Sequence, residues 1–192
     1  MKILFATNNQ HKLKEIRELI GDKIYIESLN DHGIFEEIPE TGQTLEQNAL
    51  QKARYINNKY NIDCFADDTG LEVKALDNRP GVYSARYAGE NCTFDDNVNK
   101  LLKELGDIKD RRACFRTVIV FIRNNRIHKF EGIIEGIITK QKSGYEGFGY
   151  DPVFKPNSSV KTFAEMSRDE KISISHRSIA MNKLVTFLKT IS

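Results

Sequence analysis

Two long β-rich runs in the second half of the chain limit what it can fold into. They cover residues 113–122 and 126–139, and Asn124-Asn125 between them predicts a hairpin. Elsewhere, short strand-like segments are interspersed with helix-like segments. This mixture indicates an α/β or mixed α+β architecture.

Hydrophobic periodicity predicts the remaining elements. We expect strands at 2–7, 25–29, 63–68 and 71–76, with a turn at Thr69-Gly70 between the last two. We expect a first helix after the polar stretch 8–11, with Leu13, Ile16 and Ile20 on one face and Gly21 as a stop. Further helices are expected from the capping box Thr44/Gln47 onward, from about 94 to 105 before Gly106, and from about 178 to 188.

Composition narrows the class of protein. The 192 residues fit one domain or two closely packed lobes, and 40% of them are hydrophobic, which is enough for a buried core. Basic residues exceed acidic ones only by 29 to 27. A net charge of +2 gives no case for a nucleic-acid partner, so any bound anion must be held by a local cluster.

Cysteine usage and the apolar runs predict the compartment. Cys64, Cys92 and Cys114 form an odd set without metal-type spacing, which argues against a disulfide framework or a zinc site. The N-terminal apolar run is too short for a signal peptide, and no stretch approaches the length of a membrane span. We therefore expect a cytoplasmic protein that does not bind membranes.

The polar loop between the first strand and the first helix is the first candidate binding site. It contains Thr7, Asn8, Asn9, Gln10, His11 and Lys12. A hydroxyl, amides, a lysine and a helix start together suit a triphosphate, and Asn8 tolerates the left-handed backbone of a tight phosphate turn. The loop lacks the Walker A pattern. On local pattern alone, a capped helix start with solvated polar residues is the simpler interpretation.

Three acidic residues form the second candidate site. Glu40 lies in an acidic loop, whereas Asp67 and Asp68 end an apolar strand. Adjacent residues of a continuing strand point to opposite sides, so only one of the two aspartates can face a hard cation such as Mg²⁺. Asp-Asp-Thr-Gly is also ordinary turn composition. The preceding strand favours a position at the carboxyl edge of a sheet, where ligands commonly bind.

Two further groups lie near the C-terminus. Phe148, Gly149, Tyr150 and Asp151 offer an aromatic face, a close backbone approach and an acceptor for a flat ligand. Lys171, His176 and Arg177 supply donors for a carbonyl oxygen. A tight aromatic turn and an exposed basic helix start explain the same residues structurally.

The order of these motifs is more specific than any one of them. The motifs are Ala6-Thr7-Asn8-Asn9 with Lys12 and Glu15, Pro39-Glu40-Thr41-Gly42, Glu46-Gln47-Asn48-Ala49 with Lys52-Ala53, Ala66-Asp67-Asp68-Thr69-Gly70-Leu71, Pro80-Gly81-Val82-Tyr83-Ser84-Ala85-Arg86, Phe148-Gly149-Tyr150-Asp151 and Ser175-His176-Arg177. Together they resemble the inosine triphosphate pyrophosphatase family over essentially the whole chain.

The resemblance implies a fold and an activity. The fold is an elongated, two-lobed mixed α/β fold with a central mixed sheet and a nucleotide-binding cleft between the lobes, formed by one domain over residues 1–192. The activity is Mg²⁺-dependent attack of water at the α-phosphorus of inosine, deoxyinosine and xanthosine triphosphates. It yields a monophosphate and pyrophosphate, cleanses the nucleotide pool and is usually carried by a homodimer.

The resemblance also assigns roles by motif position. Thr7 through Lys12 would hold the phosphates, and Glu40 and Asp68 would hold the metal, with Asp68 also the proton acceptor. The residues that would contact the nucleotide are Thr69, Phe148, Gly149, Tyr150, Asp151, Lys171, His176 and Arg177. Lys52 and Asp67 are possible supporting residues.

This chain departs from the family at two positions, and some alternatives stay open. Asn8 stands where many members have glycine, and Thr69 where many have serine. A carboxylate bound to Mg²⁺ is a weakened base, so Asp68 either accepts the proton or mainly aligns the water. A related pyrophosphatase for pyrimidine nucleotides and a nucleotide-binding module without turnover are the competing functions. Glu40 and Asp68 favour catalysis, because carboxylates repel phosphates unless a metal intervenes.

Overall fold

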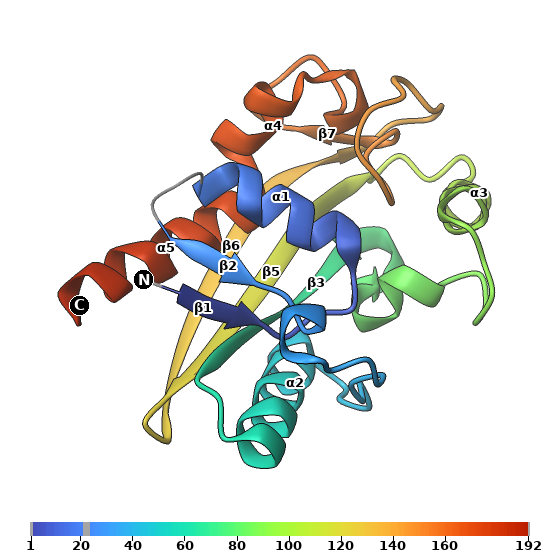
Figure 1. Ribbon diagram of the computed structural model, residues 1–192. Helices are drawn as coiled ribbons and strands as arrows, with labels where there is room; N and C mark the ends of the chain where they lie inside the picture. The colour runs from blue at the N-terminus through green and yellow to red at the C-terminus, as the bar shows by residue number, and fades with distance from the viewer. Residues whose placement is uncertain (1, 21–23, 192) are drawn as a thin grey trace. The chain divides into compact units, whose positions relative to one another are not determined.

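The computed structural model describes residues 2–20 and 24–191, in which helices and strands are interspersed (Figure 1). The helices are α1 (Gln10–Ile20), α2 (Leu45–Tyr60), α3 (Phe94–Leu105), α4 (Arg168–Ile174) and α5 (His176–Thr190). The strands are β1 (Lys2–Phe5), β2 (Tyr25–Glu27), β3 (Cys64–Val73), β4 (Arg79–Pro80), β5 (Arg112–Arg123), β6 (Arg126–Ile138) and β7 (Phe154–Pro156). Single 3₁₀ turns occur at Asn30–His32, Lys74–Leu76 and Phe163–Glu165, and a longer 3₁₀ segment at Gly81–Arg86.

The chain divides into two compact units, each built from segments that are distant in sequence. Unit 1 comprises Met1–Asp68, Thr117–Gly132 and Arg177–Ser192. Unit 2 comprises Thr69–Arg116 and Ile133–His176. Strands β3, β5 and β6 contribute residues to both units, and each unit has a hydrophobic core of its own.

In unit 1, helices cover both faces of a sheet with the strand order β2-β1-β3-β5-β6. Strand β1 runs parallel to β2 and to β3, with Phe5 beside Phe65 in register. Side chains alternate between the faces of a strand, and Phe5 and Phe65 belong to the core that α1 and α5 cover. Cys64 faces the other way and donates from Sγ to the carbonyl of Ala53 in α2 at 3.4 Å.

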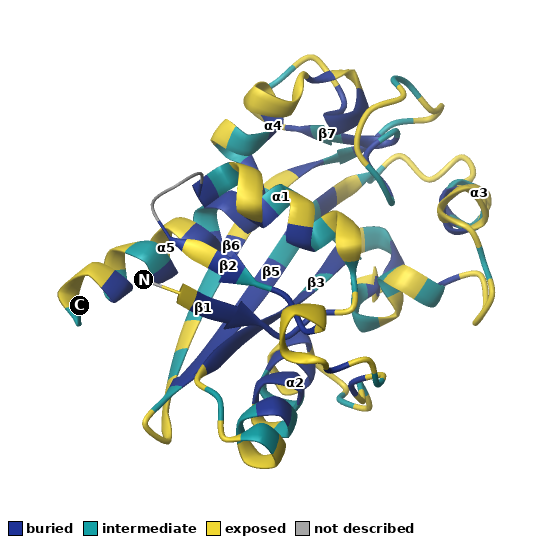
Figure 2. Ribbon diagram, viewed as in Figure 1, coloured by how far each residue is buried: buried dark blue, intermediate teal, exposed yellow. Residues whose placement is uncertain are grey.

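In unit 2, the strands follow the order β4-β3-β5-β6-β7. The pairs β3–β4 and β6–β7 are antiparallel. Helix α3 contributes Val98, Leu101 and Leu105 to the core of this unit. Figure 2 shows how burial follows the pattern of each element, with dark stripes on the helices and dark central strands.

Several local predictions are confirmed. Helix α2 begins after the capping box of Thr44 and Gln47, and α3 ends at Gly106, whose N–H donates to the carbonyl of Leu102. Asn124 and Asn125 have φ values of 50° and 60°, the left-handed pair that a two-residue type I′ hairpin turn requires. The mixed α/β fold class is confirmed as well. Gly21, the predicted stop of α1, lies outside the described residues.

Other predictions are wrong. Strand β3 continues through Thr69-Gly70 to Val73, because its second half pairs with β4 and lies next to β5 in the sheet. The predicted turn is therefore absent, and Asp67 and Asp68 lie inside a strand and not at its carboxyl edge. Helix α5 begins at His176, two residues before the predicted start, and α4, β4 and β7 were not predicted.

Among the described residues, no helix is long and apolar enough to cross a membrane.

Candidate active site

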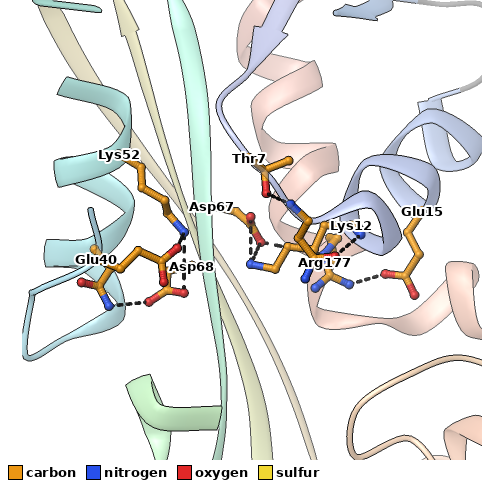
Figure 3. Close-up of polar contacts among 10 residues, drawn as sticks. Thr7, Lys12, Glu15, Glu40, Lys52, Asp67, Asp68 and Arg177 are labelled. Carbon is orange, nitrogen blue, oxygen red and sulfur yellow. Dashed lines mark hydrogen bonds and ion pairs between the residues drawn. The ribbon is translucent and has the colours of Figure 1, made fainter. Parts of the chain in front are cut away.

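Strand β3 presents two consecutive carboxylates to opposite faces of the unit 1 sheet, as predicted from the two-residue period (Figure 3). Asp67 follows Phe65 toward α1 and α5, and Asp68 follows Cys64 toward α2. Both are buried, with exposed fractions of 0% and 6%. A buried charge is stable only with a partner, and the two residues have different ones.

Asp67 is held by cations from α1 and α5. Lys12 Nζ lies 3.0 Å from each carboxylate oxygen, and Arg177 Nε lies 3.9 Å from Oδ2. Arg177 also forms an ion pair with Glu15 of α1. Burial acts to raise the pKa of Asp67, but Lys12, Arg177 and Lys52 outweigh it and hold the pKa below its usual value. The pKa of Lys12 is lowered by burial, against the pull of Asp67. This group is a charge-balanced network around an ionised Asp67.

On the other face, Lys52 lies between two carboxylates. Its Nζ is 2.5 Å from Glu40 Oε1 and 3.9 Å from Asp68 Oδ1, and its side chain is 4% exposed. Burial lowers the pKa of Lys52, but Asp68, Asp67 and Glu40 together raise it above its usual value. For Asp68 the balance is reversed, because burial and Glu40 raise its pKa more than Lys52 and Lys12 lower it. The face thus concentrates two carboxylates around one ammonium.

The polar loop before α1 is organised as a helix start. Thr7 Oγ1 accepts from the N–H of Asn9, and Asn9 Oδ1 caps α1 by accepting from the N–H of Lys12. Asn8 has no left-handed backbone, so the expectation based on its residue type is wrong. Its Nδ2 donates to the carbonyl of Glu36 at 3.2 Å instead. The capped helix start is therefore present, and its N-terminus leaves backbone donors that suit an anion.

In unit 2, Asp151 organises the glycine-rich loop. Its Oδ2 accepts from the N–H of Phe148 at 2.8 Å and from Lys171 Nζ at 2.7 Å. Lys171 Nζ also lies 5.2 Å from the centre of the Phe148 ring. A Cβ on Gly147 would lie 2.0 Å from Asp151 Oδ2, so only glycine allows this approach. Asp151 and Lys171 are buried, whereas Phe148 is half-buried.

The other predicted residues of unit 2 differ in accessibility. Tyr150 is buried and donates its hydroxyl to the carbonyl of Ser84 at 3.0 Å. His176 is buried, and its ring stacks on Phe115 with centroids 4.6 Å apart. Thr69 and Gly149 are half-buried. Tyr150 and His176 are therefore fixed by their buried surroundings, whereas Thr69 and Gly149 are more accessible.

Two groups of predicted residues thus form, one in each unit. The unit 1 group contains Thr7, Lys12, Glu40, Lys52, Asp67, Asp68 and Arg177. Gln10 and His11 are exposed in the first turn of α1. The unit 2 group contains Phe148, Asp151 and Lys171.

Sequence reasoning assigned no site role to two residues of unit 1. Glu15 is the ion-pair partner of Arg177, and Asn48 donates to Asp68 at 3.0 Å. The signal was available for Asn48, because the spacing of four residues from Lys52 places both on one face of α2. An asparagine on a buried helix face needs a polar partner.

The donor set around Lys52 fits a hard divalent cation. Among the described residues, no group of three or more histidine, cysteine or acidic side chains surrounds a common point. Mg²⁺ does not need such a cage, since it is usually bound through one or two carboxylates and keeps several waters. Glu40 and Asp68 supply two carboxylates that approach the same Lys52 ammonium.

Fold and site together define a mixed α/β protein with a buried centre of carboxylates and lysines. The chain belongs to the Ham1 family, whose model matches residues 3–187. It is 51% identical over 189 residues to a dITP/XTP pyrophosphatase of Flavobacterium psychrophilum, covering 98% of this chain and 100% of that one. It is 53% identical over 188 residues to a dITP/XTP pyrophosphatase of Porphyromonas gingivalis, covering 97% of both. The structure of the Staphylococcus aureus Ham1 protein is similar over 100% of both chains, with 39% identity and a TM-score of 0.90.

Proposed function

We propose that this protein hydrolyses non-standard purine nucleoside triphosphates, namely ITP, dITP and XTP, to the monophosphate and pyrophosphate. Relatives that are about half identical over nearly the whole chain are dITP/XTP pyrophosphatases, which supports this substrate class. The observation that carries the reaction type is the placement of Lys52 between Glu40 and Asp68. Carboxylates at this position would repel a phosphate chain unless they held a cation.

Glu40 and Asp68 are the residues that would hold Mg²⁺. Bound there, the cation would offset the negative charge of the phosphate oxygens and make the phosphorus more open to attack. The raised pKa of Asp68, caused by burial and by Glu40, suits a group that accepts a hydrogen bond or a proton from the attacking water. Lys52, buried and charged, would neutralise a phosphate oxygen on the same face.

The helix start at Thr7 through Lys12 would bind the phosphates. Backbone N–H groups of the first turn of α1 point along the helix axis toward its N-terminus, and the exposed Gln10 and His11 add side-chain donors. Lys12 Nζ contributes charge while it neutralises Asp67. Pyrophosphate is the product of attack at the α-phosphorus, and it would leave from this loop.

Phe148, Asp151 and Lys171 are the residues that would contact the base. Phe148 offers a half-buried ring on which the base would stack. Asp151 and Lys171 would supply an acceptor and a donor to the edge of the base. The half-buried Thr69 and Gly149, with Tyr150 and His176, would complete the nucleotide contacts. Arg177 has donors and no acceptor, so in contact with the base it would favour the keto oxygen at C6 of hypoxanthine and xanthine over the amino group of adenine.

Homodimer formation and a cytoplasmic location are part of the same proposal. The dimer rests on the resemblance to the family, and a mass twice that of the chain in light scattering would support it. Three free cysteines among the described residues are in keeping with a reducing compartment.

The deciding experiment measures products. Purified protein is incubated with ITP, dITP, XTP, ATP and GTP, with Mg²⁺ and with EDTA, and pyrophosphate and orthophosphate are measured separately. We expect pyrophosphate from the first three substrates and only with the cation. Orthophosphate with a nucleoside diphosphate as the primary products would overturn the proposed reaction. Equal rates on all five substrates would overturn the proposed specificity.

A further inference from the structure

Asn48 is fully buried on α2 and makes two hydrogen bonds that join separate elements. Its Nδ2 donates to Asp68 Oδ2 at 3.0 Å, and its Oδ1 accepts from the N–H of Gly42 at 2.7 Å. Asp68 belongs to β3, and Gly42 lies two residues after Glu40 in the loop before α2. One side chain therefore connects the backbone of the Glu40 loop to the carboxylate of Asp68.

The chemistry of these contacts requires an amide. A primary amide donates to a carboxylate with its nitrogen and accepts from a backbone N–H with its oxygen at the same time. A carboxylate cannot donate when ionised, and an apolar side chain does neither. Gly42 fits the same constraint, because a Cβ there would lie 2.7 Å from Asn48 Oδ1.

The hydrogen bond from Asn48 also sets the direction in which the second carboxylate oxygen of Asp68 points. With Oδ2 held by Asn48, Oδ1 is the atom that lies 3.9 Å from Lys52 Nζ. Lys52 is four residues after Asn48 on the same face of α2 and contacts Glu40 at 2.5 Å. The bond to Gly42 anchors the loop from which Glu40 reaches this point.

We propose that Asn48 is a positioning residue that fixes the separation and orientation of Glu40 and Asp68 for a divalent cation. The inference rests on the proposed function for the role of these carboxylates. It assigns Asn48 no contact with substrate. Loss of its amide leaves both carboxylates in the chain but removes the connection that holds them at a common point.

The test compares two variants with a matched control. Asn48→Leu keeps the size and removes both hydrogen bonds, and Asn48→Ser keeps a polar group too short to reach both partners. Gln51→Ala is the control, because Gln51 joins α2 to the same loop through hydrogen bonds to Thr41 at 2.9 and 3.0 Å and not through either carboxylate. Mn²⁺ is the probe, and its binding to the substrate-free protein is followed by the electron paramagnetic resonance signal of free Mn²⁺.

We expect both Asn48 variants to bind Mn²⁺ about tenfold or more weakly, and Gln51→Ala to bind it within about twofold of the wild type. The Mg²⁺ concentration for half-maximal pyrophosphate release should shift by a similar factor. Near-uv circular dichroism identifies a variant that fails to fold, in which case the other variant decides. Wild-type Mn²⁺ affinity in a folded Asn48 variant, or an equal loss in Gln51→Ala, would overturn the inference. A wild type that binds Mn²⁺ but releases no pyrophosphate would instead overturn the proposed function.

Discussion

Asp67 and Asp68 are neighbours in β3, yet their carboxylates lie on opposite faces of the sheet and are balanced by different cations. Lys12 and Arg177 hold the pKa of Asp67 down against burial, so its charge stabilises the fold at neutral pH. Burial and Glu40 raise the pKa of Asp68, so its charge destabilises the fold in the absence of a cation. The two residues should therefore respond oppositely to the same substitution.

We expect Asp68→Asn to lose activity and Asp67→Asn to lose stability. Asp68→Asn should reduce the rate of pyrophosphate release by about 10²-fold or more, with a free energy of unfolding equal to or above that of the wild type. Asp67→Asn leaves Lys12 and Arg177 without their counter-charge and should lower the free energy of unfolding by about 3 kcal/mol, with a milder loss of rate. Urea unfolding and steady-state rates measure both quantities. Equal rate losses in the two variants would contradict the assignment.

Removing the guanidinium of Arg177 should narrow the preference for hypoxanthine over adenine. A donor left unpaired against the amino group of adenine costs about 1–3 kcal/mol in a closed pocket, so one contact accounts for roughly tenfold to hundredfold discrimination. Arg177→Ala should therefore lower kcat/KM for ITP much more than for ATP. Because Arg177 also pairs with Glu15, Glu15→Gln serves as a control for the loss of that ion pair. An unchanged ratio of ITP to ATP activity in Arg177→Ala would mean that specificity lies elsewhere.

Two glycines of the same loop should tolerate alanine differently. Gly147 and Gly149 have φ values of +78° and +64°, so each alanine substitution costs about 1–2 kcal/mol in backbone strain. A Cβ on Gly147 would also meet Asp151, whereas no atom lies within 4 Å of a Cβ on Gly149. Gly147→Ala should thus raise the KM for ITP by about tenfold or more through displacement of Asp151, with a smaller effect of Gly149→Ala. Similar KM values in the two variants would argue against a role of Asp151 in binding.

The three cysteines should react with thiol reagents in a fixed order. Burial, aided by Asp63, raises the pKa of Cys64 to about 12, and burial with Glu72 raises that of Cys114 to about 11. The thiolate is the reactive form, so at about pH 8 both should be modified at least 100-fold more slowly than an exposed thiol. We expect Cys92, which is half-buried, to be alkylated first, then Cys114 and last Cys64. Peptide mapping of the native protein after timed alkylation measures the order, and early modification of Cys64 would contradict it.

Local signals in the sequence were sufficient for some parts of the fold. The strand period of two predicts that Asp67 and Asp68 lie on opposite faces, without knowledge of their partners. The capping box at Thr44 and the Asn124-Asn125 turn depend on a few neighbouring residues, so their chemistry is readable without the tertiary structure.

The remaining parts depend on contacts between distant segments. Thr69-Gly70 has turn composition, but pairing with β4 keeps the chain extended there. Helix α4 has a capping box at Ser167 and Glu170, but its seven residues are too few for the hydrophobic period to predict a helix. The pairing of Lys12 with Asp67 joins residues 55 positions apart, and no local pattern selects that partner from among the 29 basic residues.

The discontinuous construction of unit 1 has a consequence for how the protein is made. Its final segment, in α5, supplies Ala180, Met181, Leu184 and Leu188 to the core that β1 and α1 begin. The ribosome synthesises β1, α1 and β3 long before α5. Until α5 emerges, the apolar residues of these elements that α5 covers therefore remain exposed. A translation product that stops short of α5 would carry both aspartates but neither this packing nor Arg177. Such products should stay unfolded and be degraded, so that only completed chains hold the charge network around Asp67.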